Sequence, residues 1–228
     1  MGEIADPRGR VIVIGREPLL GELGRILESP VARVLLVGDP GIGKTTVWTA
    51  ALDRVPNSVA RWELRCFEAE QDVGLTVLAG LYDLIPNDIV ESLPTPQRRA
   101  VDGVLYRDPG PLEGAPLNSR LLGQTTLSVL RAAAQQSELL LAVDDLQWCD
   151  PVSEAALSFA LRRCDNTVRV LATSRRESSP ISDVVRVELP PLDHESIQRL
   201  VHLKAGRATT ARQTEEVARA SLGNPFCR

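Results

Sequence analysis

The sequence predicts an α/β fold in which helices flank a central parallel sheet of five strands. Short runs rich in valine and leucine alternate along the chain with longer segments whose apolar residues recur at helical spacing. With 228 residues, the chain is long enough to bury a substantial core. Its 43% hydrophobic and 25% charged residues are ordinary for a globular domain, so the composition agrees with this fold class.

Five apolar runs supply the expected strands. The run from Leu139 to Val143 contains no polar residue, which is typical of a strand buried on both faces of a parallel sheet. Helical segments separate most of the runs, and this alternation favours parallel pairing. The expected strands are Val31–Gly38, Val59–Cys66, Glu138–Asp145, Val168–Ser174 and Val184–Leu189.

Helical spacing of apolar residues marks the segments between and after these strands. The stretch Pro86–Pro116 is different, because it is rich in proline, glycine and aspartate, and we expect a mobile insertion around a short helix near Gln97–Leu105. The other expected helices are Leu19–Glu28, Lys44–Arg54, Thr76–Leu84, Arg120–Gln135, Glu154–Arg163, Glu195–Lys204 and Arg212–Ser221.

The pattern changes after Pro190 and Pro191, beyond which it is purely helical and ends shortly after Gly223. We therefore expect one α/β domain over residues 1–190 and the start of a small helical lid subdomain over residues 191–228. The second unit is expected to be incomplete in this chain.

Composition excludes several classes of function. A net charge of −4 and only 4% aromatic residues argue against binding nucleic acid through phosphate neutralisation or base stacking. No apolar run reaches the roughly 18–20 residues of a membrane span, and the N-terminal MGEIADPRGR lacks the apolar core of a secretory signal. The chain is therefore expected to be cytoplasmic, without membrane or nucleic-acid contacts of its own.

The cysteines and histidines do not form a zinc-binding pattern. No two cysteines have CxxC spacing, and the chain has only two histidines, His194 and His202. The cysteines are therefore expected to be free thiols in a reducing compartment. They lie at positions 66, 149, 164 and 227.

The residues 38–45, GDPGIGKT, match the phosphate-binding pattern GxxxxGK[ST] and lie between an expected strand and an expected helix. Glycines allow main-chain N–H groups to surround a phosphate, and the helix start adds its positive dipole end. Lys44 can reach the β- and γ-phosphates, the Thr45 hydroxyl can bind Mg²⁺, and Thr46 can contact the α-phosphate. The expected phosphate-binding residues are Gly38, Asp39, Pro40, Gly41, Ile42, Gly43, Lys44, Thr45 and Thr46.

Two acids follow the most apolar strand. A nucleotide site of this kind needs a carboxylate at the end of a neighbouring strand to orient Mg²⁺, and Asp144 is in the expected place. Asp145 could act as the general base that polarises the attacking water. The alternative is that both acids only end the strand and begin a turn. Asp150 with Pro151 is best explained as the start of the next helix, although Gln147 or Trp148 could also contact the nucleotide.

The strand after the acidic one ends in Thr173, Ser174 and Arg175. A hydroxyl at this edge, for which we select Ser174, can hydrogen-bond a water or the γ-phosphate, and Arg175 can contact the γ-phosphate directly. The same residues could equally be a solvated strand exit.

Taken together, these segments resemble the STAND-type ATPase domain of large LuxR-family bacterial transcriptional regulators, which are AAA-related P-loop ATPases. The likeness runs from about Val13 to Phe226. The P-loop is common to many NTPases, whereas the other motifs are more specific to this group. The motifs are GRE at 15–17, GDPGIGKTT at 38–46, LLLAVDDLQWCDP at 139–151, LATSRRE at 171–177 and SLGNPF at 221–226.

This resemblance implies that the strand ending near Ser174 lies between the P-loop strand and the acidic strand. It also implies that Arg16 and Pro225 flank the adenine and that Arg175 senses the γ-phosphate. ATP and ADP forms would be on and off states, with slow Mg²⁺-dependent hydrolysis and ATP-promoted self-association. Family members continue into a complete lid, a repeat-rich sensor region and a helix-turn-helix, so DNA binding is not expected from these residues.

Two other functions stay open. A small-molecule kinase could use the same P-loop, and its lid arginines would have to be Arg98, Arg99 and Arg107 of the expected insertion. A nucleotide-binding scaffold without hydrolysis would differ from the regulatory ATPase only in turnover. Arg98, Arg99 and Arg107 fit a solvated surface better than a lid, and the catalytic acid is an aspartate where many related motors use glutamate.

Overall fold

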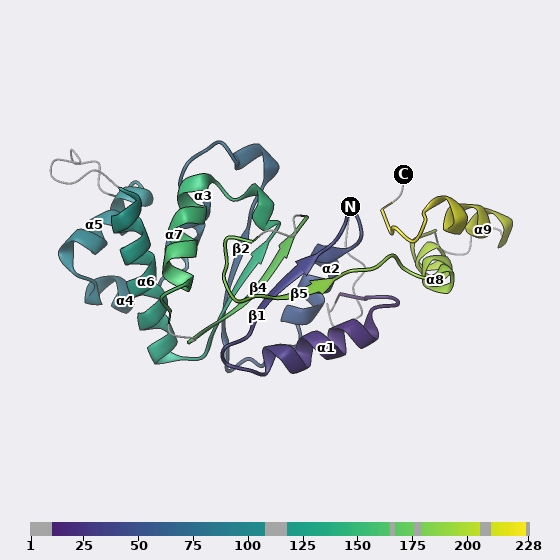
Figure 1. The fold of residues 1–228 in the computed structure, drawn as a ribbon, viewed down its shortest axis with the longest axis horizontal. Coiled ribbons are helices and arrows are strands. Elements are labelled where there is room, and N and C mark those ends of the chain that lie inside the picture. Colours follow the sequence, from purple (N-terminus) through teal and green to yellow (C-terminus); the bar gives the residue numbers. More distant parts are fainter. Residues whose placement is uncertain (1–10, 108–117, 165–166, 176–178, 206–210, 227–228) are drawn as a thin grey trace.

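Five parallel strands form the centre of the protein in the computed structural model (Figure 1). Each neighbouring pair in the sheet runs parallel. The predicted fold class is confirmed, as is the placement of the strand that ends at Ser174 between the P-loop strand and the acidic strand. Each expected strand lies within two residues of its observed bounds. In spatial order the strands are β2 (Ala60–Arg65), β3 (Leu139–Asp144), β4 (Val168–Ser174), β1 (Arg33–Val37) and β5 (Val185–Glu188).

The structure describes residues 11–107, 118–164, 167–175, 179–205 and 211–226. The N-terminal MGEIADPRGR, the end of the predicted insertion from residue 108 onward, and Cys227 lie outside these ranges. Within the described residues, no helix is both long enough and apolar enough to cross a membrane.

Burial along the strands follows their position in the sheet. Every residue of β3 and β4 is buried, as expected for inner strands covered on both faces, whereas the edge strands β2 and β5 leave several residues exposed. The continuous apolar run of β3 is therefore a direct consequence of its inner position.

Helices pack on both faces of the sheet and enclose two apolar clusters. One cluster joins α1 (Glu17–Leu27) and α2 (Lys44–Leu52) to the sheet through side chains such as Leu23 and Trp48. The other cluster lies under the helices on the opposite face. These helices are α3 (Thr76–Asp83), α4 (Asn87–Ser92), α5 (Thr95–Val104), α6 (Ser119–Gln136) and α7 (Pro151–Leu161). Two short 3₁₀ turns, η1 (Glu68–Glu70) and η2 (Leu146–Trp148), follow β2 and β3.

The expectation of a mobile insertion around a single helix is wrong for its described part, residues 86–107. This part forms two helices, α4 and α5, and Ile89, Val101 and Val104 are almost completely buried. Pro86 and Pro94 immediately precede the two helices, a position at which proline ends an extended segment without breaking a helix. Burial of these apolar side chains therefore outweighs the turn-like composition.

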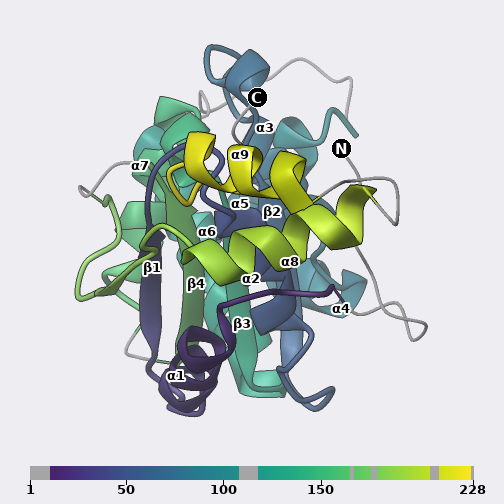
Figure 2. The ribbon, with the colours of Figure 1, turned by 90° about the vertical axis from the view of Figure 1, so that its right-hand side faces the viewer.

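The last two helices, α8 (His194–Ala205) and α9 (Ala211–Ala220), lie side by side at one end of the molecule (Figures 1 and 2). His194 Nε2 and Glu215 Oε2 are 2.8 Å apart and connect the two helices. The Leu192 N–H donates to the Gly223 carbonyl at 2.8 Å, so the chain entering α8 is bonded to the chain leaving α9.

Asp150 connects two helix starts. Its carboxylate caps α7 through the Ser153 N–H at 3.0 Å, as predicted, and also accepts from the Leu75 N–H at 3.0 Å and the Val77 N–H at 3.4 Å at the start of α3. Burial by itself raises the pKa of Asp150, but the hydrogen bonds outweigh it and hold the pKa below 3.8. Asp150 itself is fully buried, so its carboxylate has these N–H groups rather than bulk water as partners.

Replacing Asp150 with alanine should lower the free energy of unfolding by about 2–3 kcal/mol, because two helix starts lose their acceptor. Urea denaturation at neutral pH measures this change. Because the folded-state pKa is depressed, the stabilisation is present above pH 3.8 and is lost as the pH falls through the folded value.

The matched control is Asp83→Ala, since Asp83 is 72% exposed and forms a surface ion pair with Arg107. This change should cost less than about 1 kcal/mol. Equal losses in the two variants would contradict the role given to Asp150.

Candidate functional site

The loop between β1 and α2 has the backbone of a phosphate cradle. Gly41 and Gly43 have φ values of +79° and +98°, a region that residues with a side chain rarely adopt. Gly43 precedes the first residue of α2, so the N–H groups at the start of this helix face the loop without a capping side chain. The Lys44 ammonium donates to the carbonyls of Gly38 at 2.8 Å and Asp39 at 3.0 Å.

Lys44 lies next to three charged side chains from the other strand ends. Its side chain is buried, and this burial lowers the pKa of Lys44, while the nearby carboxylates of Asp145 and Asp144 raise it and Arg175 lowers it. The fold therefore brings the P-loop lysine, the acids after β3 and the arginine after β4 to one place.

Asp144 ends β3 as a buried carboxylate. The Thr173 hydroxyl of β4 donates to its Oδ1 at 2.6 Å, and the Thr45 hydroxyl of α2 hydrogen-bonds to it as well. Burial raises the pKa of Asp144, and these two hydroxyl groups oppose that rise. The carboxylate of Asp144 and the hydroxyl of Thr45 are thus adjacent oxygen atoms of the kind that Mg²⁺ binds.

The protein supplies only part of a metal shell at this place. Among the described residues, no group of three or more His, Cys, Asp or Glu side chains could hold a metal ion. A Mg²⁺ ion at Thr45 and Asp144 would need phosphate oxygens and water to complete its six ligands.

Asp145 follows directly and has a different environment. Its φ of +54° is unusual for a residue with a side chain, and its N–H donates to the Thr173 hydroxyl at 2.8 Å. The Gln147 amide donates to Asp145 Oδ1 at 2.9 Å. The turn after β3 therefore places Asp145 in the lining of the P-loop cavity.

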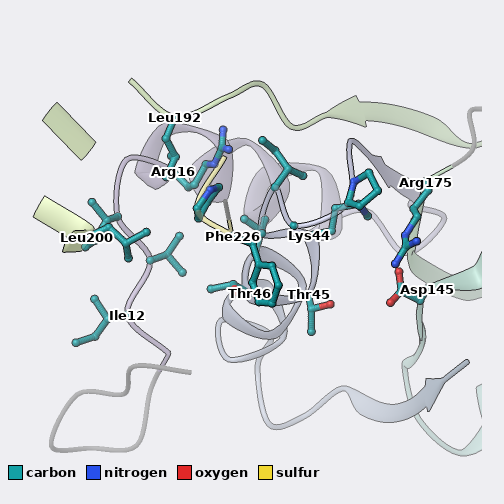
Figure 3. Close-up of a pocket in the computed structure, with 18 residues that line it drawn as sticks. Ile12, Arg16, Lys44, Thr45, Thr46, Asp145, Arg175, Leu192, Leu200 and Phe226 are labelled. Carbon is teal, nitrogen blue, oxygen red and sulfur yellow. The ribbon is translucent and has the colours of Figure 1, made fainter. Parts of the chain in front are cut away.

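A cavity of about 330 Å³ begins at this charged end and continues along the P-loop (Figure 3). Asp145 and Arg175 lie at one end of the view, and Ile12 and Leu200 lie at the other, so the cavity has one charged end and one apolar end. Its volume is in the range of ligand-binding pockets. It is lined by Ile12–Ile14, Arg16, Pro40–Val47, Asp145, Arg175, Leu192, Leu200, Pro225 and Phe226.

Arg16 is a polar group among the apolar lining. Its side chain is only 5% exposed, and its Nη2 is buried without a hydrogen-bond partner within the described part of the chain. Burial lowers the pKa of Arg16, and the charge of Asp193 opposes this effect. A buried N–H donor without an acceptor is unfavourable, so a ligand with an acceptor atom at this point would be favoured.

The segment after α9 contacts the P-loop. The Asn224 amide donates to the Pro40 carbonyl at 2.9 Å, although 184 positions separate the two residues. The Asn224 Oδ1 accepts from the Phe226 N–H at 2.9 Å, which fixes the turn. A side chain at Gly41 would begin 2.7 Å from the Phe226 Cβ, so glycine is needed for this close approach.

The structure gathers most of the predicted site residues around the cavity. The residues that line it are Arg16, Pro40, Gly41, Ile42, Gly43, Lys44, Thr45, Thr46, Asp145, Arg175 and Pro225. The other four do not line the cavity. The carbonyls of Gly38 and Asp39 accept from Lys44, and Asp144 hydrogen-bonds to Thr45. Ser174 is buried.

Sequence reasoning selected Ser174 but gave no role to Thr173, the hydroxyl that contacts both acids. Adjacent residues of a strand face opposite sides, so Thr173 and Ser174 are not expected to contact the two acids together. Asn224 was also missed as a P-loop contact, although it stands in the quoted GNPF motif.

The AAA ATPase domain family matches residues 12–172, which is most of the chain and includes the P-loop and both acids. The chain belongs to the AAA ATPase domain family. No curated protein sequence matches this AAA domain.

Solved structures confirm the fold of the AAA domain at low sequence identity. The Walker-type ATPase PABY2304 of Pyrococcus abyssi has a TM-score of 0.55 at 16% identity, with 99% of this chain and 67% of that chain covered. Cdc6p from Pyrobaculum aerophilum has a TM-score of 0.56 at 15% identity, with coverage of 93% and 56%. Domain III of the replication initiation protein DnaA from Thermotoga maritima has a TM-score of 0.53 at 15% identity, with coverage of 97% and 85%.

The chain also covers only part of longer proteins. It spans 29% of a STAND protein with a tetratricopeptide repeat sensor from Pyrococcus horikoshii, at a TM-score of 0.49 and 15% identity.

Thr173→Val should destabilise the AAA domain by about 1–3 kcal/mol, because it removes the donor to Asp144 and the acceptor of the Asp145 N–H. Burial raises the folded-state pKa of Asp144, so the ionised carboxylate destabilises the folded protein as the pH rises through this pKa. The Thr173 hydroxyl offsets part of this loss of stability, because it hydrogen-bonds to the carboxylate. The loss should therefore be larger at about pH 7 than at about pH 4 in urea denaturation.

Thr173→Ser is the matched control for this prediction, because it keeps the hydroxyl and should retain most of the stability. A Thr173→Val variant as stable as the parent at both pH values would contradict the proposed support of Asp144.

Proposed function

We propose that this AAA domain binds Mg·ATP, hydrolyses it slowly and acts as the nucleotide switch of a LuxR-type transcriptional regulator. In this proposal, residues 1–190 are the ATPase domain and residues 191–228 are part of a helical lid. The observation that carries the proposal is that one cavity is lined both by the P-loop and by the C-terminal segment, whose Asn224 is bonded to Pro40.

The residues around the cavity suggest how ATP would be held. The P-loop amides, Lys44 and Thr46 would bind the phosphates, and Thr45 with Asp144 would hold Mg²⁺. Mg²⁺, when bound, neutralises charge on the phosphate oxygens. At the apolar end, Arg16 would donate to a nitrogen acceptor of the adenine while Pro225 packs against the ring. The absence of a guanine-reading NKxD motif mildly favours adenine.

Hydrolysis would use the charged end of the cavity. A water oxygen forms the new bond to the γ-phosphorus, the bond from that phosphorus to the bridging oxygen breaks, and ADP is the leaving group. Asp145 is proposed to accept the proton of the attacking water, and Arg175 to stabilise charge on the γ-phosphate. Both side chains line the cavity beside Lys44.

A switch follows if ATP and ADP contact the two parts of the chain differently. A ligand shifts a conformational equilibrium only by its difference in affinity for the two states, and the γ-phosphate is the group by which ATP and ADP differ. We therefore propose nucleotide-dependent self-association as the output, in the cytoplasm. No DNA contact is proposed for these residues.

The kinase alternative has less support. Of its three candidate arginines, Arg107 forms a surface ion pair with Asp83, and Arg98 and Arg99 lie on α5. Figure 1 shows α5 at the end of the molecule opposite to α8 and α9. These arginines would have to move across the molecule to close over the phosphates. The scaffold alternative differs only in turnover and is decided by the same experiment as the ATPase.

Lys44→Ala should weaken ATP binding by about 10–100-fold, because a charge-assisted hydrogen bond to phosphate is lost. Titration with ATP, ADP and GTP, together with an assay of phosphate release, measures binding and turnover in the same preparation. Asp145→Asn should retain ATP binding and lower turnover by on the order of 10²-fold or more.

Arg54→Ala is the control, because Arg54 is exposed and lies just beyond the opposite end of α2 from Lys44. Unchanged ATP affinity in Lys44→Ala would refute the site. ATP binding without turnover in the parent would favour the scaffold.

Arg175→Ala should reduce the difference in oligomer size between the ATP-bound and ADP-bound protein, because the proposed γ-phosphate contact is lost. Light scattering after size-exclusion chromatography measures this difference. A difference as large as in the parent would show that Arg175 does not report the γ-phosphate.

A further inference from the structure

The side chain of Gln147 bridges the ends of two strands. Its Nε2 donates to Asp145 Oδ1 at 2.9 Å, and its Oε1 accepts from the Arg175 N–H at 3.0 Å. Gln147 belongs to η2, the short turn that follows β3, whereas Arg175 follows β4. One carboxamide therefore connects an acid beside the P-loop to the arginine at the end of the neighbouring strand.

The main chain around this bridge is held as well. The N–H of Asp145, a residue with φ of +54°, donates to the Thr173 hydroxyl at 2.8 Å. The main-chain N–H of Asp145 is therefore bonded to β4, and one oxygen of its carboxylate, Oδ1, is bonded to Gln147. Within the described residues the other carboxylate oxygen, Oδ2, has no hydrogen-bond partner and could accept a proton.

The residue after Gln147 holds the arginine side chain. The Arg175 guanidinium carbon lies 5.3 Å from the centre of the Trp148 ring, within the range of a cation–π contact. Gln147 thus bonds the Arg175 main chain, and Trp148 packs against its side chain. Two consecutive residues of η2 position Arg175.

We propose that Gln147 is a positioning residue for ATP hydrolysis, which fixes the Asp145 carboxylate and ties its orientation to that of Arg175. This inference rests on the proposed role of Asp145 as general base. Gln147 does not line the cavity, so it acts through Asp145 and Arg175 rather than on the nucleotide. A base that is held in place retains the geometry that proton transfer needs.

The chemistry of the bridge requires an amide. A carboxamide donates to Asp145 and accepts from Arg175 at the same time, whereas an ionised carboxylate can only accept. Methionine has a similar length but makes neither hydrogen bond. Glutamate keeps the acceptor for the Arg175 N–H but places a second negative charge against Asp145.

Steady-state ATP hydrolysis by Gln147→Met and Gln147→Glu of the 228-residue chain tests the proposal. We expect kcat to fall about tenfold for methionine and about a hundredfold for glutamate, because misplacement of a catalytic group by about 1 Å is sufficient for such losses. The KM for ATP should change less than about twofold, since a lower kcat at constant KM indicates an interaction used only in the transition state.

The order of the two variants separates positioning from a structural role. If Gln147 only anchored the Arg175 main chain, glutamate would preserve that bond and would be more active than methionine. Glutamate equal to or better than methionine, or a raised KM at constant kcat, would overturn the proposal. Gln136→Met is the matched control and should hydrolyse ATP like the parent, because the Gln136 amide donates to Asp88 at 2.7 Å on the surface, away from the cavity.

The same assay distinguishes failure of this inference from failure of the proposed function. Turnover that is lost in Lys44→Ala but unchanged in Gln147→Met would overturn only the role of Gln147. No turnover in the parent would remove the proposed hydrolysis and the positioning role together.

Discussion

The hydrogen bond from Thr173 to the buried Asp144 carboxylate is the interaction on which the geometry of the site depends. It joins β3 to β4, and the Thr45 hydroxyl on the same carboxylate brings in the first turn of α2. A buried carboxylate needs such donors, because an uncompensated charge in the interior is strongly unfavourable. The parallel sheet supplies them by ending its inner strands at one edge, so the fold and the chemistry of the site have the same origin.

Much of this arrangement could be predicted from the sequence because its causes are local. The run Leu139–Val143 had to be an inner strand, since only a position covered on both faces keeps five consecutive apolar residues from water. The pattern of glycines and Lys44 likewise predicts a phosphate cradle, because the left-handed backbone at Gly41 and Gly43 is nearly restricted to glycine.

Other features have no local cause and were missed or misread. Helix α4 lies in a proline-rich stretch, and only its burial against the core, which depends on distant segments, makes it a helix. The contact of Asn224 with Pro40 joins residues 184 positions apart. The second partner of Asp150, at the start of α3, and the hydrogen bonds of Thr173 with both acids depend in the same way on which elements meet in space.

Arg16 has a consequence for how ligand binding and folding are linked. Its Nη2 is buried without an acceptor within the described residues, and a buried donor without a partner is unfavourable. A molecule that accepts from this donor recovers that free energy as affinity, whereas one of the same shape that lacks the acceptor does not. The unpaired donor of Arg16 would thus distinguish ligands that have an acceptor from those that do not. A ligand bound in the cavity would also raise the melting temperature of the protein.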